Sequence, residues 1–490
     1  MSLGIEAKKS DFNEWYNEIV RKCDIVDIRY PVKGFPVYRH WGTFLIKRIT
    51  SALEQELEEA GHSPMSFPVV IPEKNLDIEK EHAKGFHEEV FWITHAGKNE
   101  LDEKLFLRPT SETAIYPMFS IWVRSHTDLP LKMYQSCQVY RYETKMTKPL
   151  LRGREFFWIE THTVQKNNEA AVRQVSEDMR IAEAVISEKL ALPFLLLQRP
   201  EWDKFPGADN TYAYDTLLPD GRTLQIATTH NLGQKFAKAF SIKYASEKSE
   251  SVYACQTCFG PGVSRMVASI IAVHGDDHGL IMPPNIAPLQ AIIIPILIKG
   301  KESIVDKKCK EVLDRLKKMG LRVKYDNSDK SPGFKFNEWE MKGIPLRIEI
   351  GPKDIEAKSI TFVRRDIGEK KQIKEKDMDS LSETLDKMFE DIKAKAQENF
   401  DSRIATCSSM KEAEKHIEKG FVRANFCSLK KDGEKCAEKI EKELGAKVRG
   451  VMFGRQNNAQ SASAIPEKPF GACIACGSAG EHVVYVARAY

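Results

Sequence analysis

Hydrophobic positions along the chain repeat with two different periods, and each period predicts a different kind of element. Apolar residues that return at three- and four-residue steps predict amphipathic helices, and the clearest such pattern covers 41–60. Further helical segments are predicted at 11–21, 168–190, 260–274, 302–319, 334–342 and 379–396. Strands, several with an alternation typical of half-buried strands, are predicted at 134–141, 154–163, 212–217, 222–228 and 251–259.

The order of these elements changes twice along the chain, which predicts three domains. Residues 1–285 combine long helices with strand hairpins. Residues 286–398 begin with the continuous apolar strand 291–298, of the kind buried in parallel sheets, and continue in βαβα order. This order implies a small α/β domain with a largely parallel or mixed sheet. Residues 399–490 form the remainder, and a length of 490 residues agrees with about three domains.

The composition is that of a soluble globular protein, with 42% hydrophobic and 29% charged residues. The sequence has no apolar segment after Met1 and no run long enough to span a bilayer, so we expect a cytoplasmic protein without a membrane partner. A net charge of +4 is too small to identify a nucleic-acid partner. Ten cysteines without a secretion signal favour thiols or a metal site over a disulfide scaffold.

The most informative stretch is a predicted hairpin with charged residues on one face. Arg141 and Glu143 lie two positions apart at the end of one strand, and Glu160 and His162 repeat this spacing on the return strand. Residues two apart share a face of a strand, and such charges are costly on a buried sheet unless they are partnered. They form either a structural ion-pair ladder or a site for a zwitterion and a polyphosphate. The forked guanidinium of arginine suits the second function.

The letters of this hairpin, Y-R-Y-E followed by L-R-G-R-E-F-F-W-I-E-T-H, resemble motif 2 of the class II aminoacyl-tRNA synthetases in its prolyl-tRNA synthetase version. The helix 41–60 and the following S-F-P-V-V-I-P resemble motif 1, the dimer interface of this class, and Pro68 marks its strand as an edge or an interface. G-P-G-V-S-R-M-V, which contains Arg265, resembles motif 3.

The resemblance implies a fold class and a role for each predicted domain. The fold class is α/β, with an α+β catalytic domain whose antiparallel sheet is flanked by helices over 1–285. An α/β anticodon-binding domain follows over 286–398, and a small zinc-bearing domain closes the chain over 399–490. The implied assembly is a homodimer.

The resemblance also implies a pocket for proline. In R-P-T-S-E-T, Thr110 and Glu112 could serve only to begin a helix, but prolyl enzymes use this T-x-E segment to hold the imino group of proline. The secondary ammonium has two N–H donors, and a hydroxyl and a carboxylate supply two acceptors. Arg141 then meets the proline carboxylate. The other residues implied for this pocket are Trp158 as an aromatic wall, Glu160, His162, His230 and, as a lid, Phe86.

By the same resemblance, ATP lies beside proline. The residues implied for ATP are Arg141, Glu143, Arg152, Gln225, Thr228 and Arg265, with Mg²⁺ at the outer phosphates. Arg141 bridges the proline carboxylate and the α-phosphate, and Arg265 meets the outer phosphates, so these two arginines are the predicted catalytic residues. The proline carboxylate itself attacks the phosphate, and the protein contributes positioning and charge stabilisation.

The second domain resembles the anticodon-binding domain of class IIa synthetases, which makes tRNA(Pro) the implied partner. Glu340, Arg347 and Lys353 could read guanine edges in an unpaired anticodon loop. The charged helix 302–319 is better explained as a solvated face.

Two groups of cysteines near the C-terminus predict a structural Zn²⁺ site. Its predicted ligands are Cys427, Cys436, Cys473 and Cys476, although the first spacing is longer than in a usual zinc knuckle. The competing pair is Cys255-x-x-Cys258. Because residues three apart on a strand face opposite sides, we interpret that pair as structural or incidental thiols.

The leading hypothesis is an ATP-dependent proline–tRNA ligase of the archaeal and eukaryotic type. The interval from Glu160 to Arg265 is too short for the editing insertion of bacterial-type enzymes. A threonyl-type synthetase is disfavoured by the T-x-E segment with Trp158, and an inactive RNA-binding paralogue by the intact arginines of motifs 2 and 3. Archaeal and eukaryotic prolyl enzymes also end in a tyrosine that approaches the catalytic site, which gives Tyr490 a predicted role in turnover.

Overall fold

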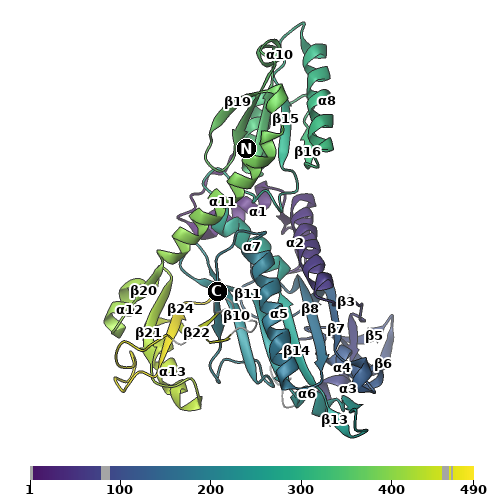
Figure 1. The fold of residues 1–490 in the computed structure, drawn as a ribbon, viewed down its shortest axis with the longest axis vertical. Coiled ribbons are helices and arrows are strands. Elements are labelled where there is room, and N and C mark those ends of the chain that lie inside the picture. Colours follow the sequence, from purple (N-terminus) through teal and green to yellow (C-terminus); the bar gives the residue numbers. More distant parts are fainter. Residues whose placement is uncertain (1–3, 79–88, 455–462, 465–466) are drawn as a thin grey trace.

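The structure is a computed structural model that describes residues 4–78, 89–454, 463–464 and 467–490. Phe86, the predicted lid residue, lies outside the described residues. In Figure 1 a small upper domain stands above a broad lower body, and the long helix α11 (Ser380–Asp401) runs down from the upper domain to the segments at the C-terminal end of the chain. Among the described residues, no helix is both long and apolar enough to cross a membrane.

The N-terminal part of the chain forms the centre of the lower body. Its helices are α1 (Phe12–Lys22), α2 (His40–Glu59), α3 (Glu73–Ile78), α4 (Glu112–Trp122), the 3₁₀ turn η1 (His126–Asp128), α5 (Asn168–Ile186), α6 (Lys235–Ala239) and α7 (Val263–His274). Its strands are β1 (Val26–Asp27), β2 (Val37–Tyr38), β3 (Ser63–Pro64), β4 (Val70–Pro72), β5 (Phe91–Ala96), β6 (Asn99–Leu107), β7 (Leu131–Tyr140), β8 (Glu155–Gln165), β9 (Leu195–Gln198), β10 (Asn210–Leu217), β11 (Thr223–Gly233), β12 (Lys243–Ala245), β13 (Ser251–Tyr253) and β14 (Cys255–Pro261).

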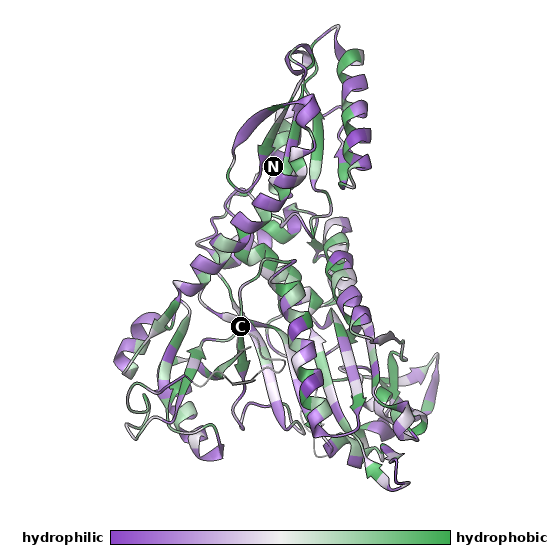
Figure 2. Cartoon of the chain, viewed as in Figure 1, coloured by the Kyte–Doolittle hydropathy of each residue, from purple (hydrophilic) through white to green (hydrophobic). Residues whose placement is uncertain are grey.

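The upper domain has a mixed sheet, as the βαβα order predicts. Its elements are β15 (Ala291–Pro295), α8 (Glu302–Lys318), β16 (Val323–Tyr325), α9 (Pro332–Met341), β17 (Leu346–Ile350), α10 (Pro352–Glu356), β18 (Ser359–Arg364), β19 (Lys370–Lys374) and the turn η2 (Glu375–Asp377). β15 pairs in parallel with β16 and β17, and β18 and β19 complete the sheet antiparallel. Bands of both colours alternate along α8 in Figure 2, which fits a helix with one solvated face.

The C-terminal part adds its strands to the central sheet. It comprises β20 (Ile404–Thr406), α12 (Met410–His416), β21 (Phe421–Phe426), the turn η3 (Lys431–Gly433), α13 (Glu434–Leu444), β22 (Lys447–Gly454), β23 (Ser463–Ala464) and β24 (His482–Ala487). The order of the large sheet is β20-β21-β24-β22-β9-β10-β11-β14-β8-β7-β3. β22 therefore joins the other strands of the C-terminal part to β9. The division into domains at 285/286 and 398/399 stays a prediction.

One glycine makes the contact between β22 and β9 possible. Gly450 has φ +125°, and a Cβ atom there would lie 2.1 Å from the carbonyl oxygen of Gln198. The next residue, Val451, pairs with Gln198 in antiparallel register. A larger side chain would separate the two strands, so this position needs glycine.

The helices α2, α5 and α7 lie side by side on one face of the central sheet (Figure 1). Ile159 on β8 is fully buried in the core beneath them. Its neighbours Trp158 and Glu160 line a cavity. Since successive side chains on a strand point to opposite faces, the cavity lies on the face of the sheet away from these helices.

The strand predicted across S-F-P-V-V-I-P is wrong in its extent. The structure has β4 only from Val70 to Pro72. Ahead of it, the backbone N–H of Phe67 donates to Gln135 Oε1 at 3.1 Å, and Arg108 Nη1 donates to the Phe67 carbonyl at 2.9 Å. Because side chains use these backbone groups, residue 67 does not join a ladder.

Candidate active site

A cavity of about 450 Å³ lies against β8, β11 and the start of α7. Alternate residues of β8 line it: Phe156, Trp158, Glu160 and His162. The other predicted residues that line it are Thr110, Glu112, Arg141, Glu143, Arg152, Gln225, Thr228, His230 and Arg265. The structure therefore brings together all the predicted proline and ATP residues in its described part. The size is that of an ordinary small-molecule site.

At one end of the cavity, hydrogen-bond acceptors converge. The Thr110 hydroxyl contacts the carboxylates of both Glu112 and Glu160, the latter at 3.2 Å. Glu160 also accepts from the Ser111 backbone N–H at 3.0 Å and from Gln135 Nε2 at 2.8 Å. These bonds fix two buried carboxylates beside a hydroxyl, and this arrangement suits a ligand with two N–H donors.

Burial controls the charge states of the groups at this end. Burial raises the pKa of Glu112, while the Thr110 hydroxyl and Arg141 oppose the shift. Burial lowers the pKa of His162 to about 4 and that of His230 to about 3, so both imidazoles are neutral at neutral pH. Their Nδ1 atoms lie 3.1 Å from the Tyr116 hydroxyl and 2.9 Å from the Thr211 hydroxyl, respectively.

Arg141 separates this acceptor end from the rest of the cavity. Its Nε donates to the Pro109 carbonyl at 3.0 Å, and its guanidinium lies over the rings of Phe156 and Trp158, 5.4 Å from each centroid. Burial lowers its pKa, and several nearby glutamates, Glu112 among them, oppose that shift. The rings of Phe156 and Trp158 and the Pro109 carbonyl hold the guanidinium plane in one orientation, in which it can bind an anion.

The other end of the cavity is rich in arginine. Arg265, on α7, donates to the carbonyls of Gln225 at 2.9 Å and Leu151 at 3.2 Å. Burial and the neighbouring guanidiniums of Arg141 and Arg152 lower its pKa to about 10, which keeps it charged at neutral pH. Guanidiniums this close repel one another, and a bound polyanion would relieve that repulsion.

Glu143 lies beyond the strand on which we predicted it. β7 ends at Tyr140, and the chain turns so that the N–H of Glu143 donates to the Arg141 carbonyl at 2.7 Å. Its carboxylate lies 3.8 Å from Arg152 Nε. Glu143 still lines the cavity, but it is held by the turn and by Arg152 and not by the strand face.

The structure adds cavity residues that the sequence analysis missed. Arg199, Phe205 and Arg449 line the cavity as well. Phe205 lies in the segment W-D-K-F-P-G-A of 202–208, whose resemblance to a family loop is the sequence signal for it, and its ring lies 4.8 Å from that of His230. No pattern in the sequence marks Arg449. Its place at the cavity depends on the pairing of β22, in the C-terminal part of the chain, with β9.

Cys258 was interpreted as a structural or incidental thiol, but it lines the cavity. Its Sγ atom lies within 4.8 Å of ligand atoms of Glu112 and His162, and β14 pairs with β8 so that Cys258 is directly opposite His162. This position depends on the pairing of β14 with β8, and the interpretation of Cys258 as a structural or incidental thiol stays a prediction.

The last residue of the chain reaches the arginine end. The N–H of Tyr490 donates to the Thr223 carbonyl at 3.0 Å, next to the start of β11. Its ring lies 4.4 Å from the guanidinium of Arg222 and 5.5 Å from that of Arg152. Arg488 pairs with Glu418 at 2.9 Å.

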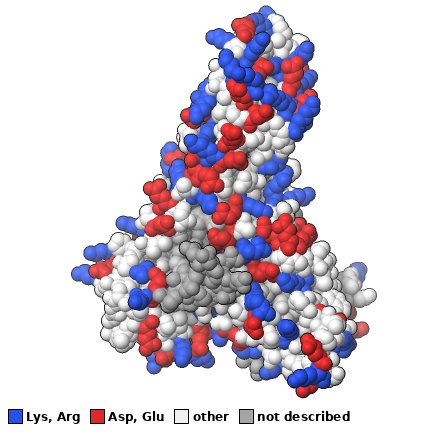
Figure 3. All heavy atoms as spheres, in the orientation of Figure 1, with Lys and Arg blue, Asp and Glu red and all other residues white. Residues whose placement is uncertain are grey.

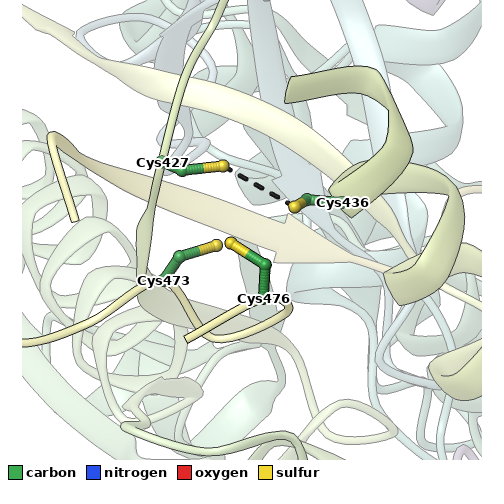
Figure 4. Close-up of side chains that lie close together, drawn as sticks. All are labelled: Cys427, Cys436, Cys473 and Cys476. Carbon is green, nitrogen blue, oxygen red and sulfur yellow. Dashed lines mark hydrogen bonds between the residues drawn. The ribbon is translucent and has the colours of Figure 1, made fainter. Parts of the chain in front are cut away.

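The four cysteines near the C-terminus come together although they lie up to 49 positions apart in the sequence (476 − 427). Their sulfur atoms all lie within 4.8 Å of one another, and those of Cys427 and Cys436 are 3.6 Å apart. Figure 4 shows the four side chains pointing toward a common centre, from the segments around β21, α13 and the loop before β24. A tetrahedral Zn²⁺ with Zn–S bonds of about 2.3 Å requires sulfur separations of about 3.8 Å.

The predicted anticodon residues lie in the upper domain, far along the molecule from the cavity. Arg347 on β17 stacks on the ring of Phe336 at 4.4 Å and lies 3.9 Å from Glu340. Lys353 is exposed on α10, which follows β17. Figure 3 shows basic and acidic side chains interleaved over this domain, so its surface is not uniformly basic.

Comparison with known families divides the chain among three family models. Residues 91–274 match the "tRNA synthetase class II core domain (G, H, P, S and T)", residues 290–388 match an "Anticodon binding domain", and residues 410–490 match "Prolyl-tRNA synthetase, C-terminal".

Curated relatives and solved structures agree with these matches. The proline–tRNA ligase of Thermofilum pendens is 45% identical and covers 99% of both chains, and that of Methanocaldococcus jannaschii is 51% identical over 80% of this chain and 86% of its own. A prolyl-tRNA synthetase of Giardia lamblia in complex with prolyl-adenylate has a TM-score of 0.94 at 38% identity, with all of both chains covered. That of Cryptosporidium parvum, with halofuginone and AMPPNP, has a TM-score of 0.92 at 35% identity, again over all of both chains.

Proposed function

The chain belongs to the prolyl-tRNA synthetases, a family of class II aminoacyl-tRNA synthetases, and from this premise we propose how its residues carry out the reaction. Its activity is the ATP-dependent ligation of proline to tRNA. The proline is first activated to prolyl-adenylate and is then transferred to the 3′ end of tRNA(Pro). The observation that carries our assignment of the site is the convergence of the Thr110 hydroxyl with two buried carboxylates beside Arg141.

Proline binds at the acceptor end of the cavity. Its secondary ammonium donates to Thr110 and Glu112, whose desolvated carboxylate favours a cationic ligand. Its carboxylate meets Arg141, and its ring lies against Trp158. Glu160, His162 and His230 complete the pocket, and the two neutral imidazoles serve as hydrogen-bond partners without adding charge.

ATP binds at the arginine end, with its α-phosphate toward Arg141. An oxygen of the proline carboxylate attacks the α-phosphorus, the bond to the β-phosphate breaks, and pyrophosphate leaves. Arg141 stabilises the charge that gathers on the α-phosphate, and Arg265 holds the leaving phosphates. Glu143, Arg152, Gln225 and Thr228 position the nucleotide.

Mg²⁺ accompanies ATP in synthetases generally, and two oxygen-bearing residues predicted to position ATP are already held by arginines. The Gln225 amide oxygen already accepts from Arg199 at 2.9 Å, and Glu143 pairs with Arg152. We therefore assign the ion to the phosphates of ATP and derive no step from a protein-bound metal.

Replacing Glu112 with glutamine tests the proline pocket. We expect the KM for proline in pyrophosphate exchange to rise about tenfold or more, because a carboxylate that partners an ammonium is lost, while the KM for ATP changes less than about twofold. Glu169→Gln, an exposed change on α5, is the matched control. An ATP KM that rises as steeply as the proline KM would contradict the assignment.

We propose that Cys427, Cys436, Cys473 and Cys476 bind one structural Zn²⁺. The convergence of four sulfur atoms supports this, and four thiolate ligands leave no coordination position for water. The ion would connect β21, α13 and the loop before β24 and so stabilise the C-terminal part of the chain.

Elemental analysis of the purified protein should give one zinc per chain. Cys473→Ser combined with Cys476→Ser should abolish zinc binding and lower the melting temperature, because two of four ligands are lost. Cys309→Ser, a buried change on α8, should retain the metal. Zinc retained by the double variant would refute the assignment.

We propose that Tyr490 supports turnover by holding Arg152, which lines the cavity, with a ring that also contacts Arg222. Deleting it should lower turnover about fivefold or more through the loss of these cation–π contacts, with little change in melting temperature. Tyr490→Phe keeps the ring and should retain most of the activity. A deletion variant that melts earlier yet turns over normally would show that Tyr490 only contributes packing.

Anticodon recognition is proposed for Glu340, Arg347 and Lys353. The planar guanidinium of Arg347, stacked on Phe336, has the geometry to read a guanine edge. Arg347→Met should raise the KM for tRNA about tenfold while leaving pyrophosphate exchange unchanged. Lys310→Met on the solvated helix α8 is the control, and an equal effect of both changes would indicate general charge attraction.

We also propose a cytoplasmic homodimer that uses the apolar surface around α4 and β4. Trp122 is 40% exposed and Ile121 54%, and the Phe67 ring lies 6.0 Å from that of Trp122. Val69 and Val70 extend this surface, which a monomer would leave in water. Light scattering should give twice the mass of one chain. Trp122→Glu should halve that mass, whereas Ile304→Glu in the upper domain should not.

A further inference from the structure

Asp215 on β10 is a fully buried carboxylate held by two arginines from different parts of the chain. Arg199, which follows β9, contacts both of its oxygens through Nη2, at 2.9 and 3.0 Å. Arg449 on β22 contacts the same two oxygens, through Nε at 2.8 Å and Nη2 at 3.2 Å. Asp215 is 0% exposed, so each ion pair is shielded from water and its geometry is well defined.

The two arginines are also joined directly. Arg199 Nη1 donates to the backbone carbonyl of Arg449. Burial opposes the charge on Arg449, yet Asp215 raises the pKa of this guanidinium above its ordinary value. A second carboxylate, that of Asp203, lies 3.7 Å from Arg199 Nε, and both arginines and Asp203 line the cavity.

The cluster ends at a proposed ATP residue. Arg199 Nη2 donates to Gln225 Oε1 at 2.9 Å. Because a guanidinium has only donors, the atom of the amide that faces it must be the oxygen. The amide nitrogen of Gln225 is then the group left for the nucleotide, as a donor to its oxygens.

We propose that Arg449 is a positioning residue for ATP: by holding Asp215 and Arg199, it fixes the Gln225 amide with its nitrogen toward the nucleotide. The C-terminal part of the chain thereby takes part in the activation of proline. Without Arg449, Arg199 alone must neutralise Asp215, and its bond to Gln225 weakens, so the amide can rotate. The inference rests on the proposed placement of ATP at Gln225.

Pyrophosphate exchange with Arg449→Met, Gln225→Ala and the double variant tests this proposal. Arg449→Met should raise the KM for ATP about tenfold, while the KM for proline changes less than about twofold. In the double variant the two effects should not add, because Arg449 acts through Gln225. Arg449→Lys keeps a charge without the fork and should give an intermediate KM for ATP.

The control is Arg423→Met, which breaks the pair of Arg423 with Glu467 at 2.8 Å in the same C-terminal part. It should leave both KM values unchanged. Additive effects in the double variant, or a rise in both KM values in proportion to a lower melting temperature, would overturn the proposal. If Arg449→Met does not fold, Arg449→Lys combined with Gln225→Ala gives the same cycle. Wild-type exchange that is independent of proline would instead refute the proposed function.

Discussion

The active site depends on buried charged side chains that the protein's own groups do not fully neutralise. One face of the central sheet carries charged side chains that are buried or half-buried, and such groups are stable only when other groups partner them. At the acceptor end, the Ser111 backbone N–H and the Gln135 amide donate to the carboxylate of Glu160. At the arginine end, guanidiniums outnumber nearby carboxylates, and the substrates complete the balance: a cation for the first end and phosphates for the second.

The continuity of the large sheet joins the N-terminal and C-terminal parts of the chain around one cavity. β22 adds to the edge of β9, and the contact is close enough to require glycine at position 450. This pairing brings Arg449 to Asp215 and lets the end of the chain reach Arg152. The part of the chain that matches a separate C-terminal family model therefore supplies Arg449 to the wall of the cavity.

Much of the fold could be predicted from local patterns in the sequence, whereas the site residues were predicted from the resemblance of their motifs to those of prolyl-tRNA synthetases. The predicted family and fold class are confirmed, and helices such as 41–60 are recognisable because their apolar residues repeat with the helical period. β8 could be predicted because its alternation is preserved around Trp158 and Glu160. The roles assigned to individual residues stay predictions.

What the sequence could not provide depends on contacts between distant segments. Cys258 lies across from His162 only because β14 pairs with β8, and Arg449 reaches Asp215 across 234 positions. The backbone of Phe67 bonds to side chains from β7 and from the end of β6, which interrupts a strand that its own residues favour. None of these pairings leaves a periodic pattern, since each is set by the register of the neighbouring strands.

The most direct test of this account is ATP–pyrophosphate exchange measured with each standard amino acid in turn. The account predicts that proline supports by far the fastest exchange, because its secondary ammonium uses both the Thr110 hydroxyl and the Glu112 carboxylate while its ring packs on Trp158. Exchange driven equally well by threonine, or by no amino acid, would contradict it.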